Sequence, residues 1–595
     1  MKLLKNAPIA ALVLVMLAIL PAAGPAAAQA GGRWLADPAL LAAPKFMGPP
    51  ADRTTFDTIA DIALSGAGAG WATAGSGVMR LENGLWRRFQ PVADNQYLSA
   101  IGLDGQEGGW IVGREVDRAA PNTSRALMLS YLNGGWRNGS NVARGDGTTA
   151  PVEGALADVA VFPGNQVWAV GSAPSDIPNW SRPLVLYHDG LQWRDVTPPE
   201  WRYGYLSSLS MVGPTEGWAA GLLGQPGGQG ADAVRPALLH LRDNTWTEAP
   251  LPALPSRGQP FTVYGVTMRD AGEGWAIYFD SGAECGFGTL LHYAGGAWSA
   301  VPPASVGWRS ITAIGLIPGT NTGWVSLGGC GARGQNLPAQ RAHFDGGSVT
   351  VDAGGSPLVP SVYALLDAST QYAAADGYLM RYTGEPPPTE RVAGARPGER
   401  FFPETGHTIA GDFRRYYETH GLELGDRGVS PRESLALFGY PVSQPFVEAN
   451  PENGERYTVQ YFERARFELH PENAEPYRVL LGRLGALSLA RRRPGAEPII
   501  PNPDPSPPPA GCARFAETGY ATCAPFTGFW RRHGGLAVFG LPIAGARDEQ
   551  SETDGRIYQT QWFERERMEY HPENKAPYDV LLGLLGSEEL RLRGY

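Results

Sequence analysis

The residues best suited to chemistry form a charged block that occurs twice in the last third of the chain. Each copy carries glutamine, phenylalanine, two arginines, glutamate and histidine at alternate positions: Gln460, Phe462, Arg464, Arg466, Glu468 and His470, then Gln561, Phe563, Arg565, Arg567, Glu569 and His571. Alternate residues of a strand share one face, so each block predicts a strand with a charged side. Guanidinium forks bind carboxylates and hydroxyls strongly. We therefore expect this face to bind an acidic or hydroxylated glycan.

Two other interpretations of this block remain open. Arginine and glutamate on one face could instead pair with each other as the outer surface of a small sheet, with no ligand. The His-x-Glu spacing could also suggest a metal, but two ligand types without a third and fourth are weak support for one. The sequence therefore predicts no metal site and no cofactor.

The charged block belongs to a longer duplication. Segment 402–406 returns as 515–519, and the Phe-Gly-x-Pro segment 438–441 returns as 539–542. Aromatic residues at three- to four-residue spacing predict a helix at 413–417 and another at 526–532. We expect two small α+β modules at 395–492 and 512–595, joined by an extended proline-rich linker at 493–511.

This order of helix, Gly-x-Pro turn and strand resembles that of LGFP repeats, which are cell-wall-associated modules of secreted bacterial proteins. The resemblance rests on Phe-Gly-Tyr-Pro and Phe-Gly-Leu-Pro at 438–441 and 539–542. It implies that the two modules attach the protein to the cell wall.

The elements before residue 392 follow a recurring tryptophan. It occupies the second predicted strand of six units, and Tyr372 takes the same position in a seventh: Trp71, Trp110, Trp168, Trp218, Trp275 and Trp324. A fourth-strand tryptophan recurs as well, with Val349 in its place in the sixth unit: Trp86, Trp136, Trp193, Trp246 and Trp298. Short strands repeated about every 50 residues are typical of propeller blades.

The seventh unit lacks a fourth strand, and Trp34 near the mature N-terminus lies in a matching Gly-Gly-x-Trp motif. We therefore predict a mainly β protein: a seven-bladed β-propeller at 31–392, closed by the N-terminal strand, followed by the two modules. The Gly-Trp-Ala-x-Gly second strand resembles that of BNR-like propellers of the photosystem II assembly-factor type. Sialidases share this layout, but their Ser-x-Asp-x-Gly-x-x-Trp turns are absent from this chain.

The repeated aromatic residues are expected to pack between neighbouring sheets. Histidines recur near the end of the third strand in four units: His188, His240, His292 and His343. A catalytic residue is seldom copied into four blades, so we expect these histidines to reflect a preference of that strand position and not a catalytic role. We predict no catalytic residue in the chain.

Two kinds of loop lie on the same face of a propeller: those that join the second strand to the third, and those that join each fourth strand to the next unit. Binding sites usually lie on this face. The longer loops of these two kinds carry aromatic and charged residues that are candidates for ligand binding: Arg118, Asp176, Trp180, Trp201, Tyr203 and Arg235. The alternative is that the aromatic residues only cover the loops' own cores.

The compartment follows from the N-terminus and the cysteines. Residues 1–30 have a basic start, an apolar core and small residues before a cleavage point near Ala30, as in a secretory signal peptide. Export favours disulfides, and we expect Cys285 to pair with Cys330 and Cys512 with Cys523.

A formal net charge of −10 argues against nucleic acid or anionic membrane as a partner. No other segment is long and apolar enough to predict a transmembrane span.

These features predict a secreted, monomeric and non-enzymatic binding or scaffold protein. Its expected partner is cell-wall or extracellular polysaccharide, or an envelope protein. Two alternatives stay open: a glycan-cleaving enzyme at the centre of the propeller, and an assembly factor for a membrane complex. Dispersed carboxylates such as Asp104, Asp158, Asp270, Glu273 and Asp367 single out no catalytic pair.

Overall fold

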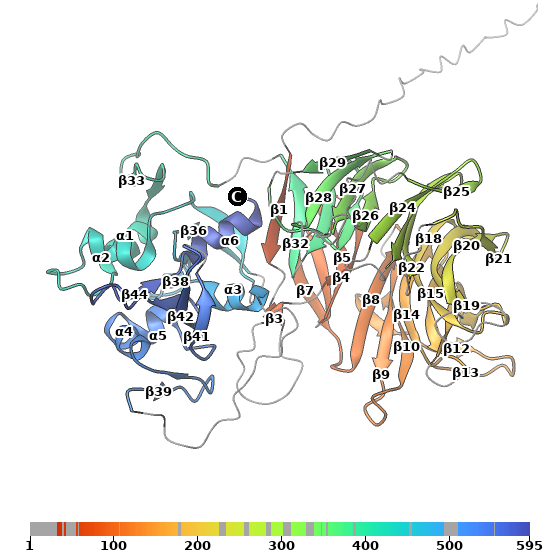
Figure 1. Ribbon diagram of the computed structural model, residues 1–595, viewed down its shortest axis with the longest axis horizontal. Helices are drawn as coiled ribbons and strands as arrows, with labels where there is room; N and C mark the ends of the chain where they lie inside the picture. Colours follow the sequence, from red (N-terminus) through yellow and green to blue (C-terminus); the bar gives the residue numbers. More distant parts are fainter. Residues whose placement is uncertain are drawn as a thin grey trace, which may run out of the picture.

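A computed structural model gives the fold of the chain. The structure describes residues 32–595 except 39–40, 43–54, 57–58, 76, 106–107, 177–179, 225–233, 255–260, 281–286, 302–310, 329–337, 347, 353–354, 376, 385–387, 452–454, 493–507, 509 and 552–553. The expected signal peptide, Cys285, Cys330 and most of the proline-rich linker lie outside the described residues. In Figure 1 the sheets drawn in orange to green pack around one another, and the teal and blue elements lie beside them.

Antiparallel sheets of consecutive strands make up the first part of the chain. The first two contain β4 (Ile59–Gly66), β5 (Ala69–Ala74), β6 (Gly77–Glu82) and β7 (Leu85–Pro91), then β8 (Gln96–Leu103), β9 (Gly109–Val116), β10 (Ser124–Leu132) and β11 (Gly135–Asn138). The third contains β14 (Ala155–Phe162), β15 (Gln166–Pro174), β16 (Ser181–Asp189) and β17 (Trp193–Asp195), extended by β12 (Val142–Ala143) and β13 (Thr149–Ala150).

Three further sheets repeat the four-stranded pattern. They contain β18 (Gly204–Gly213), β19 (Glu216–Gly224), β20 (Val234–Arg242) and β21 (Thr245–Ala249); β22 (Phe261–Asp270), β23 (Glu273–Asp280), β24 (Phe287–Ala294) and β25 (Ala297–Ala300); and β26 (Ile311–Leu316), β27 (Thr322–Leu327), β28 (Gln340–Asp345) and β29 (Ser348–Asp352). A short hairpin of β2 (Leu41–Ala42) and β3 (Thr55–Phe56) stands apart from them.

The last sheet of this group combines the two ends of the region. β30 (Val362–Leu365), β31 (Gln371–Ala375) and β32 (Tyr378–Thr383) are completed by β1 (Arg33–Pro38), which pairs with β32 and places Trp34 opposite Tyr382. The first strands contact each other in sequence, from β4 through β8, β14, β18, β22 and β26 to β30, and β30 contacts β4. The sheets therefore close into a ring, the arrangement of a β-propeller.

Aromatic side chains hold neighbouring sheets together around the whole ring. The second-strand aromatic residue of each sheet meets an aromatic residue of the next sheet edge-on, with ring centroids 4.8–6.1 Å apart: Trp71–Trp136, Trp110–Trp193, Trp168–Trp246, Trp218–Trp298, Trp275–Phe344, Trp324–Trp34 and Tyr372–Trp86. In the sixth sheet Phe344, which lies opposite Val349, makes the contact that tryptophan makes elsewhere. Edge-on pairs of this kind contribute about 0.5–1.5 kcal/mol each beyond their buried area.

The four recurring histidines pack against these tryptophans. His240 stacks on Trp218 with ring centroids 4.2 Å apart, and His292 stacks on Trp275 at 3.9 Å. His188 and His343 contact tryptophan rings in their own sheets. The prediction that the recurring tryptophans are packing residues is confirmed, and the histidines pack against them.

The C-terminal elements form two similar halves. The first has β33 (Arg400–Phe402), β34 (His407–Ile409), α1 (Gly411–Thr419), α2 (Pro431–Phe438), the sheet β35 (Phe446–Ala449), β36 (Arg456–Tyr461), β37 (Arg466–Leu469) and β38 (Val479–Leu481), and α3 (Leu484–Arg492). The second has β39 (Ala513–Arg514), β40 (Ala521–Thr522), α4 (Phe526–Arg532), α5 (Gly535–Phe539), the sheet β41 (Arg547–Gln550), β42 (Ile557–Trp562), β43 (Arg567–Tyr570) and β44 (Val580–Leu582), and α6 (Leu585–Arg593). The expected helices at 413–417 and 526–532 lie within α1 and α4.

The charged block is a hairpin, which corrects the prediction of a single strand. β36 ends at Tyr461 and β37 begins at Arg466, so the chain reverses between them. The turn is held by a hydrogen bond from the amide of Phe462 to the carbonyl of Ala465, and by one from the amide of Glu463 to the carbonyl of Tyr440. The Phe-Gly-x-Pro segment therefore supplies the acceptor that fixes the turn.

The two C-terminal halves exchange their last helices. α3, from the first half, contacts β42 of the second, and α6, from the second half, contacts β36 of the first. The amide of Ala486 donates to the carbonyl of Glu564 at 2.9 Å, and the amide of Gly586 donates to the carbonyl of Glu463 at 3.0 Å. One apolar cluster also contains phenylalanines of both halves. The halves are thus one interlocked body, which we call the C-terminal unit, and not two modules that move separately on a spacer.

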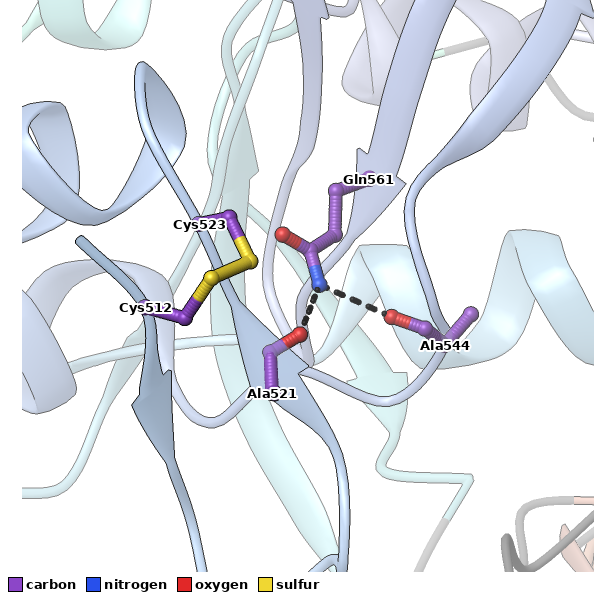
Figure 2. The surroundings of a disulfide bond; sticks show 5 residues. All are labelled: Cys512, Ala521, Cys523, Ala544 and Gln561. Carbon is purple, nitrogen blue, oxygen red and sulfur yellow. Dashed lines mark hydrogen bonds between the residues drawn. A yellow bond between two sulfur atoms is a disulfide. The ribbon is translucent and has the colours of Figure 1, made fainter. Parts of the chain in front are cut away.

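A disulfide supports the second half only. Cys512 is bonded to Cys523 across the short hairpin of β39 and β40, as predicted. Figure 2 shows the neighbouring Gln561, whose side-chain amide donates to the carbonyls of Ala521 and Ala544 at 2.9 and 3.0 Å. The disulfide therefore lies where the hairpin, the main sheet and the turn after α5 meet.

Among the helices that the structure describes, none has both the length and the apolar character needed to cross a bilayer.

Candidate functional site

The loop face of the propeller brings together residues from two loops of the third sheet. Trp180, in the loop before β16, and Tyr203, in the loop after β17, have ring centroids 6.2 Å apart. Both rings are half-buried. Asp176 and Arg202, from the same two loops, are exposed and form an ion pair. We call these four residues the aromatic platform.

One hydrogen bond and the Asp176–Arg202 ion pair join the two loops. The hydroxyl of Ser175 donates to the carbonyl of Arg202 at 3.0 Å, while within the first loop the amide of Ser175 donates to the carbonyl of Trp180 at 2.9 Å. The hydrogen bond from Arg202 holds the pKa of Asp176 below its usual value, so the pair is charged at neutral pH. The platform therefore has two partly exposed rings, a charged pair beside them and a hydrogen bond that joins its two loops.

The other predicted loop residues lie elsewhere. Trp201 packs against the apolar cluster between the third and fourth sheets, which fits the alternative that it covers a core. Arg118 pairs with Asp94, and Arg235 pairs with Glu248. Of the six predicted loop residues, the structure brings Asp176, Trp180 and Tyr203 together. Arg202 is a fourth member that the sequence reasoning passed over, although it stands between Trp201 and Tyr203.

The charged block of the C-terminal unit lies inside the molecule. Arg466 and Glu468 are 3% and 4% exposed, and they pair with each other. Arg466 also contacts Glu448 of β35 at 3.4 Å. Although burial acts to raise it, the charge of Arg466 and hydrogen bonds from His470 and Asn450 lower the pKa of Glu468 to about 2.

The second copy repeats this arrangement. Arg567 and Glu569 are 2% and 5% exposed, with Nε of Arg567 3.0 Å from Glu569. His470 and His571 are buried against tyrosine rings and each contacts the glutamate of its own copy. Arg464 and Arg565 lie in the hairpin turns and are half-buried. Glycan binding by these eight residues stays a prediction, and their pairing with each other gives it no support.

The inner strands of the ring hold two carboxylates that the sequence did not single out as a pair. Asp61 of β4 accepts hydrogen bonds from the amides of Ile62 and Ile101 at 2.8 and 2.9 Å. Asp158 of β14 accepts from the amides of Val159 and Leu209 at 2.8 and 2.7 Å. Burial, with the charge of Asp158 as a second cause, raises the pKa of Asp61 to about 7, and burial raises the pKa of Asp158 to about 6.

These two carboxylates predict a dependence of stability on pH. Their pKa values in the folded chain lie above the usual value of 3.8, so their contribution to stability is present below about pH 4 and is lost as the pH rises through 6 to 7. We expect the apparent Tm of the chain to fall between pH 5 and 8 relative to that of Asp61→Asn, measured at one scan rate. Asp548→Asn, at an exposed position, is the control. Parallel profiles for the chain and for Asp61→Asn would contradict this assignment.

Metal binding finds no support in the part of the chain that the structure describes. No group of three or more histidine, cysteine, aspartate or glutamate side chains lies close enough together there to hold an ion.

The closed ring of sheets defines a protein of the β-propeller type. No family model matches the chain, and no curated protein sequence matches it. Solved structures that resemble it include YCF48 from Cyanidioschyzon merolae, 16% identical over 59% of this chain and 98% of that one, with a TM-score of 0.37. A polysaccharide lyase, the PL25 ulvan lyase, is 10% identical over 56% of this chain and 94% of that one, with a TM-score of 0.37. The GH74 xyloglucanase from Xanthomonas campestris is 11% identical over 74% and 78% of the two chains, with a TM-score of 0.29.

Proposed function

We propose that this protein is a secreted, non-enzymatic binding protein that holds an extracellular polysaccharide on the loop face of its propeller. The aromatic platform is the observation that carries this proposal. Partly exposed tryptophan and tyrosine rings offer apolar faces on which the C–H faces of sugar rings can pack. The Asp176–Arg202 pair beside them offers hydrogen-bond acceptors and donors to sugar hydroxyls.

The finer architecture belongs to the same proposal. The seven sheets from β4 to β32, with β1 as the closing strand, are the blades of one propeller. The C-terminal unit attaches this propeller to the cell envelope. On the unit's surface a cavity of about 380 Å³ contains Tyr416 stacked on His420, with ring centroids 4.0 Å apart. This stacked pair is a better candidate for contact with a polymer than the buried charged block.

The test of polysaccharide binding is Trp180→Ala in the full-length chain. We expect it to weaken retention on insoluble cell wall, or on the polymer that binds best in a glycan panel, by about tenfold, because one stacking ring is lost. The matched control is Leu191→Ala: Leu191 is 91% exposed and lies in the turn at the opposite end of β16. Equal retention of the three proteins, with unchanged circular dichroism, would refute the platform as the binding site.

A second candidate is glycan cleavage at the centre of the propeller. Its support is the raised pKa of Asp61 and Asp158, because a general acid works best with a pKa near the working pH. Two carboxyl groups with different roles are also what glycoside hydrolysis requires. Release of reducing ends from a glycan by the full chain, abolished in Asp61→Asn, would favour this candidate over simple binding.

A further inference from the structure

A second feature of the loop face is a cavity of about 630 Å³ between the second and third sheets. Its size lies within the range of roughly 300–1,000 Å³ that small-molecule sites have. Five charged residues line it: Arg125, Arg144, Glu153, Arg182 and Asp195. They come from β10, from the segment between the second and third sheets, and from β16 and β17.

The wall of this cavity is a segment inserted between the two sheets and fixed to both. Its hairpin of β12 and β13 joins the third sheet, where β12 runs parallel to β17 and Val142 lies opposite Trp193. Its end is bonded to the second sheet: the amide of Ala126 donates to the carbonyl of Val152, and the amide of Gly154 donates to the carbonyl of Ser124, each at 2.9 Å. Backbone pairing on both sides means that the cavity is formed before a ligand arrives.

The charges in the cavity are not balanced. Arg182 pairs with Asp195 at 3.4 Å. Arg125 and Arg144 are exposed, and neither forms an ion pair with a carboxylate among the described residues. Asp146, in the same hairpin as Arg144, accepts hydrogen bonds from the hydroxyl and amide of Thr148 at 2.7 and 2.9 Å; these hydrogen bonds and, to a lesser degree, the charge of Arg144 lower its pKa. Three arginines against the two carboxylates Glu153 and Asp195 give the lining a net charge of +1, in a chain whose net charge is −10, and Arg125 lies opposite Glu153 across a β-bridge.

This combination indicates a ligand with both carboxylate and hydroxyl groups. Guanidinium forks match a carboxylate with paired hydrogen bonds, while the carboxylates of Glu153 and Asp195 can accept from hydroxyls. A uronic acid residue carries both groups on one ring. The cavity also adjoins the platform along the chain, because Arg182 follows Trp180 by two positions at the start of β16.

We propose that this cavity binds the carboxylate of a uronic acid residue, so that the polysaccharide held by the propeller is an acidic one. The aromatic platform then holds a neighbouring sugar of the same polymer, while Arg125 and Arg144 hold the acid group. This inference rests on the proposed polysaccharide binding and specifies its ligand class.

The test compares oligogalacturonate with a neutral oligosaccharide of equal length, titrated calorimetrically into the full chain and into Arg125→Gln/Arg144→Gln. The double variant is expected to bind oligogalacturonate at least about tenfold more weakly, because two charge-assisted contacts are lost. Arg87→Gln is the charge-matched control, since Arg87 is exposed on β7 in a different sheet. A sulfated oligosaccharide is the third ligand, because guanidinium groups also bind sulfate esters.

The outcomes separate this inference from the proposal on which it rests. Loss of oligogalacturonate binding in the double variant, with Arg87→Gln unchanged, supports the acid-binding cavity. Binding of the neutral oligosaccharide alone, or equal affinity for oligogalacturonate in the double variant, overturns the cavity but leaves polysaccharide binding in place. Binding of the sulfated ligand alone overturns the uronic acid assignment. If no oligosaccharide binds the full chain, both proposals fail.

Discussion

Replacing Arg593 by methionine is expected to loosen the C-terminal unit from the propeller and to destabilise their junction by about 3–5 kcal/mol. Arg593 is 1% exposed and lies on α6. Its guanidinium pairs with Glu448, donates to the hydroxyl of Tyr461 at 2.9 Å and donates to the carbonyl of Ala36 at 3.0 Å. Methionine fills a similar space. The loss of stability therefore comes mainly from Glu448 and the other polar partners, which stay buried without the cation that paired with them.

Hydrogen exchange of β1 is the measurement that distinguishes this junction from general instability. In Arg593→Met we expect faster exchange of the amides in β1 than in β18, which lies across the ring. Arg591→Met is the control, because Arg591 is exposed on the same helix. Adding Glu448→Gln to Arg593→Met should recover part of the loss, since it removes a buried carboxylate that has lost one of its partners. Unchanged exchange in β1 would show that Arg593 does not hold the junction.

The second large effect is expected at Gly586, where α6 begins. A Cβ at this position would overlap the carbonyl oxygen of Phe462, in the hairpin turn of the other half. The amides of Gly586 and Ser587 also donate to the carbonyl of Glu463 at 3.0 and 3.1 Å, so the helix cannot move away without losing both hydrogen bonds. We expect Gly586→Ala to lower the free energy of unfolding of the C-terminal unit by about 1–3 kcal/mol, measured by denaturant titration.

Two other glycines test the cause of this effect. Gly485 is the second residue of α3, as Gly586 is of α6, and a Cβ there would overlap the carbonyl oxygen of Phe563, so Gly485→Ala should lower the free energy of unfolding by a similar amount. Gly528 lies inside α4, and a Cβ there would meet no heavy atom within 4 Å. Gly528→Ala should therefore be neutral or stabilise the helix by up to about 1 kcal/mol. If all three changes had the same effect, close packing between the halves would not be the reason.

The propeller was accessible to sequence reasoning because its packing is repeated. Trp71 and its counterparts recur at similar spacing, so one blade's pattern could be transferred to the others, and the motif around Trp34 pointed to its pairing in the last sheet. The loop face was harder to predict. Trp180 and Tyr203 could be chosen as aromatic residues of long loops, but nothing in the pattern separated them from Trp201, which packs against an apolar cluster.

The charged block shows why alternation alone can mislead. Gln460 to His470 alternate as a strand does, but the turn at Phe462–Ala465 is fixed by the carbonyls of Phe438 and Tyr440, more than 20 residues earlier. The burial of Arg567 depends on a partner that is just as distant, since Glu588 of α6 contacts it at 3.2 Å, and Arg466 contacts Glu448, 18 residues earlier. The exchange of α3 and α6 was not predictable either, because the duplication shows that two halves exist but not which helix packs on which sheet.

The position of α6 over the closing strand has a consequence for the order of folding. β1 is made before every other strand of the propeller, but its partner β32 is made only after the other sheets. The hydrogen bond from Arg593 to Ala36 spans 557 residues of sequence. Contacts of such separation form slowly, and a strand without its partner exposes edge groups to other chains in the meantime. Protection of β1 until β32 has been made is therefore a requirement that this chain places on the cell in which it is made, and the contact with α6 comes later still.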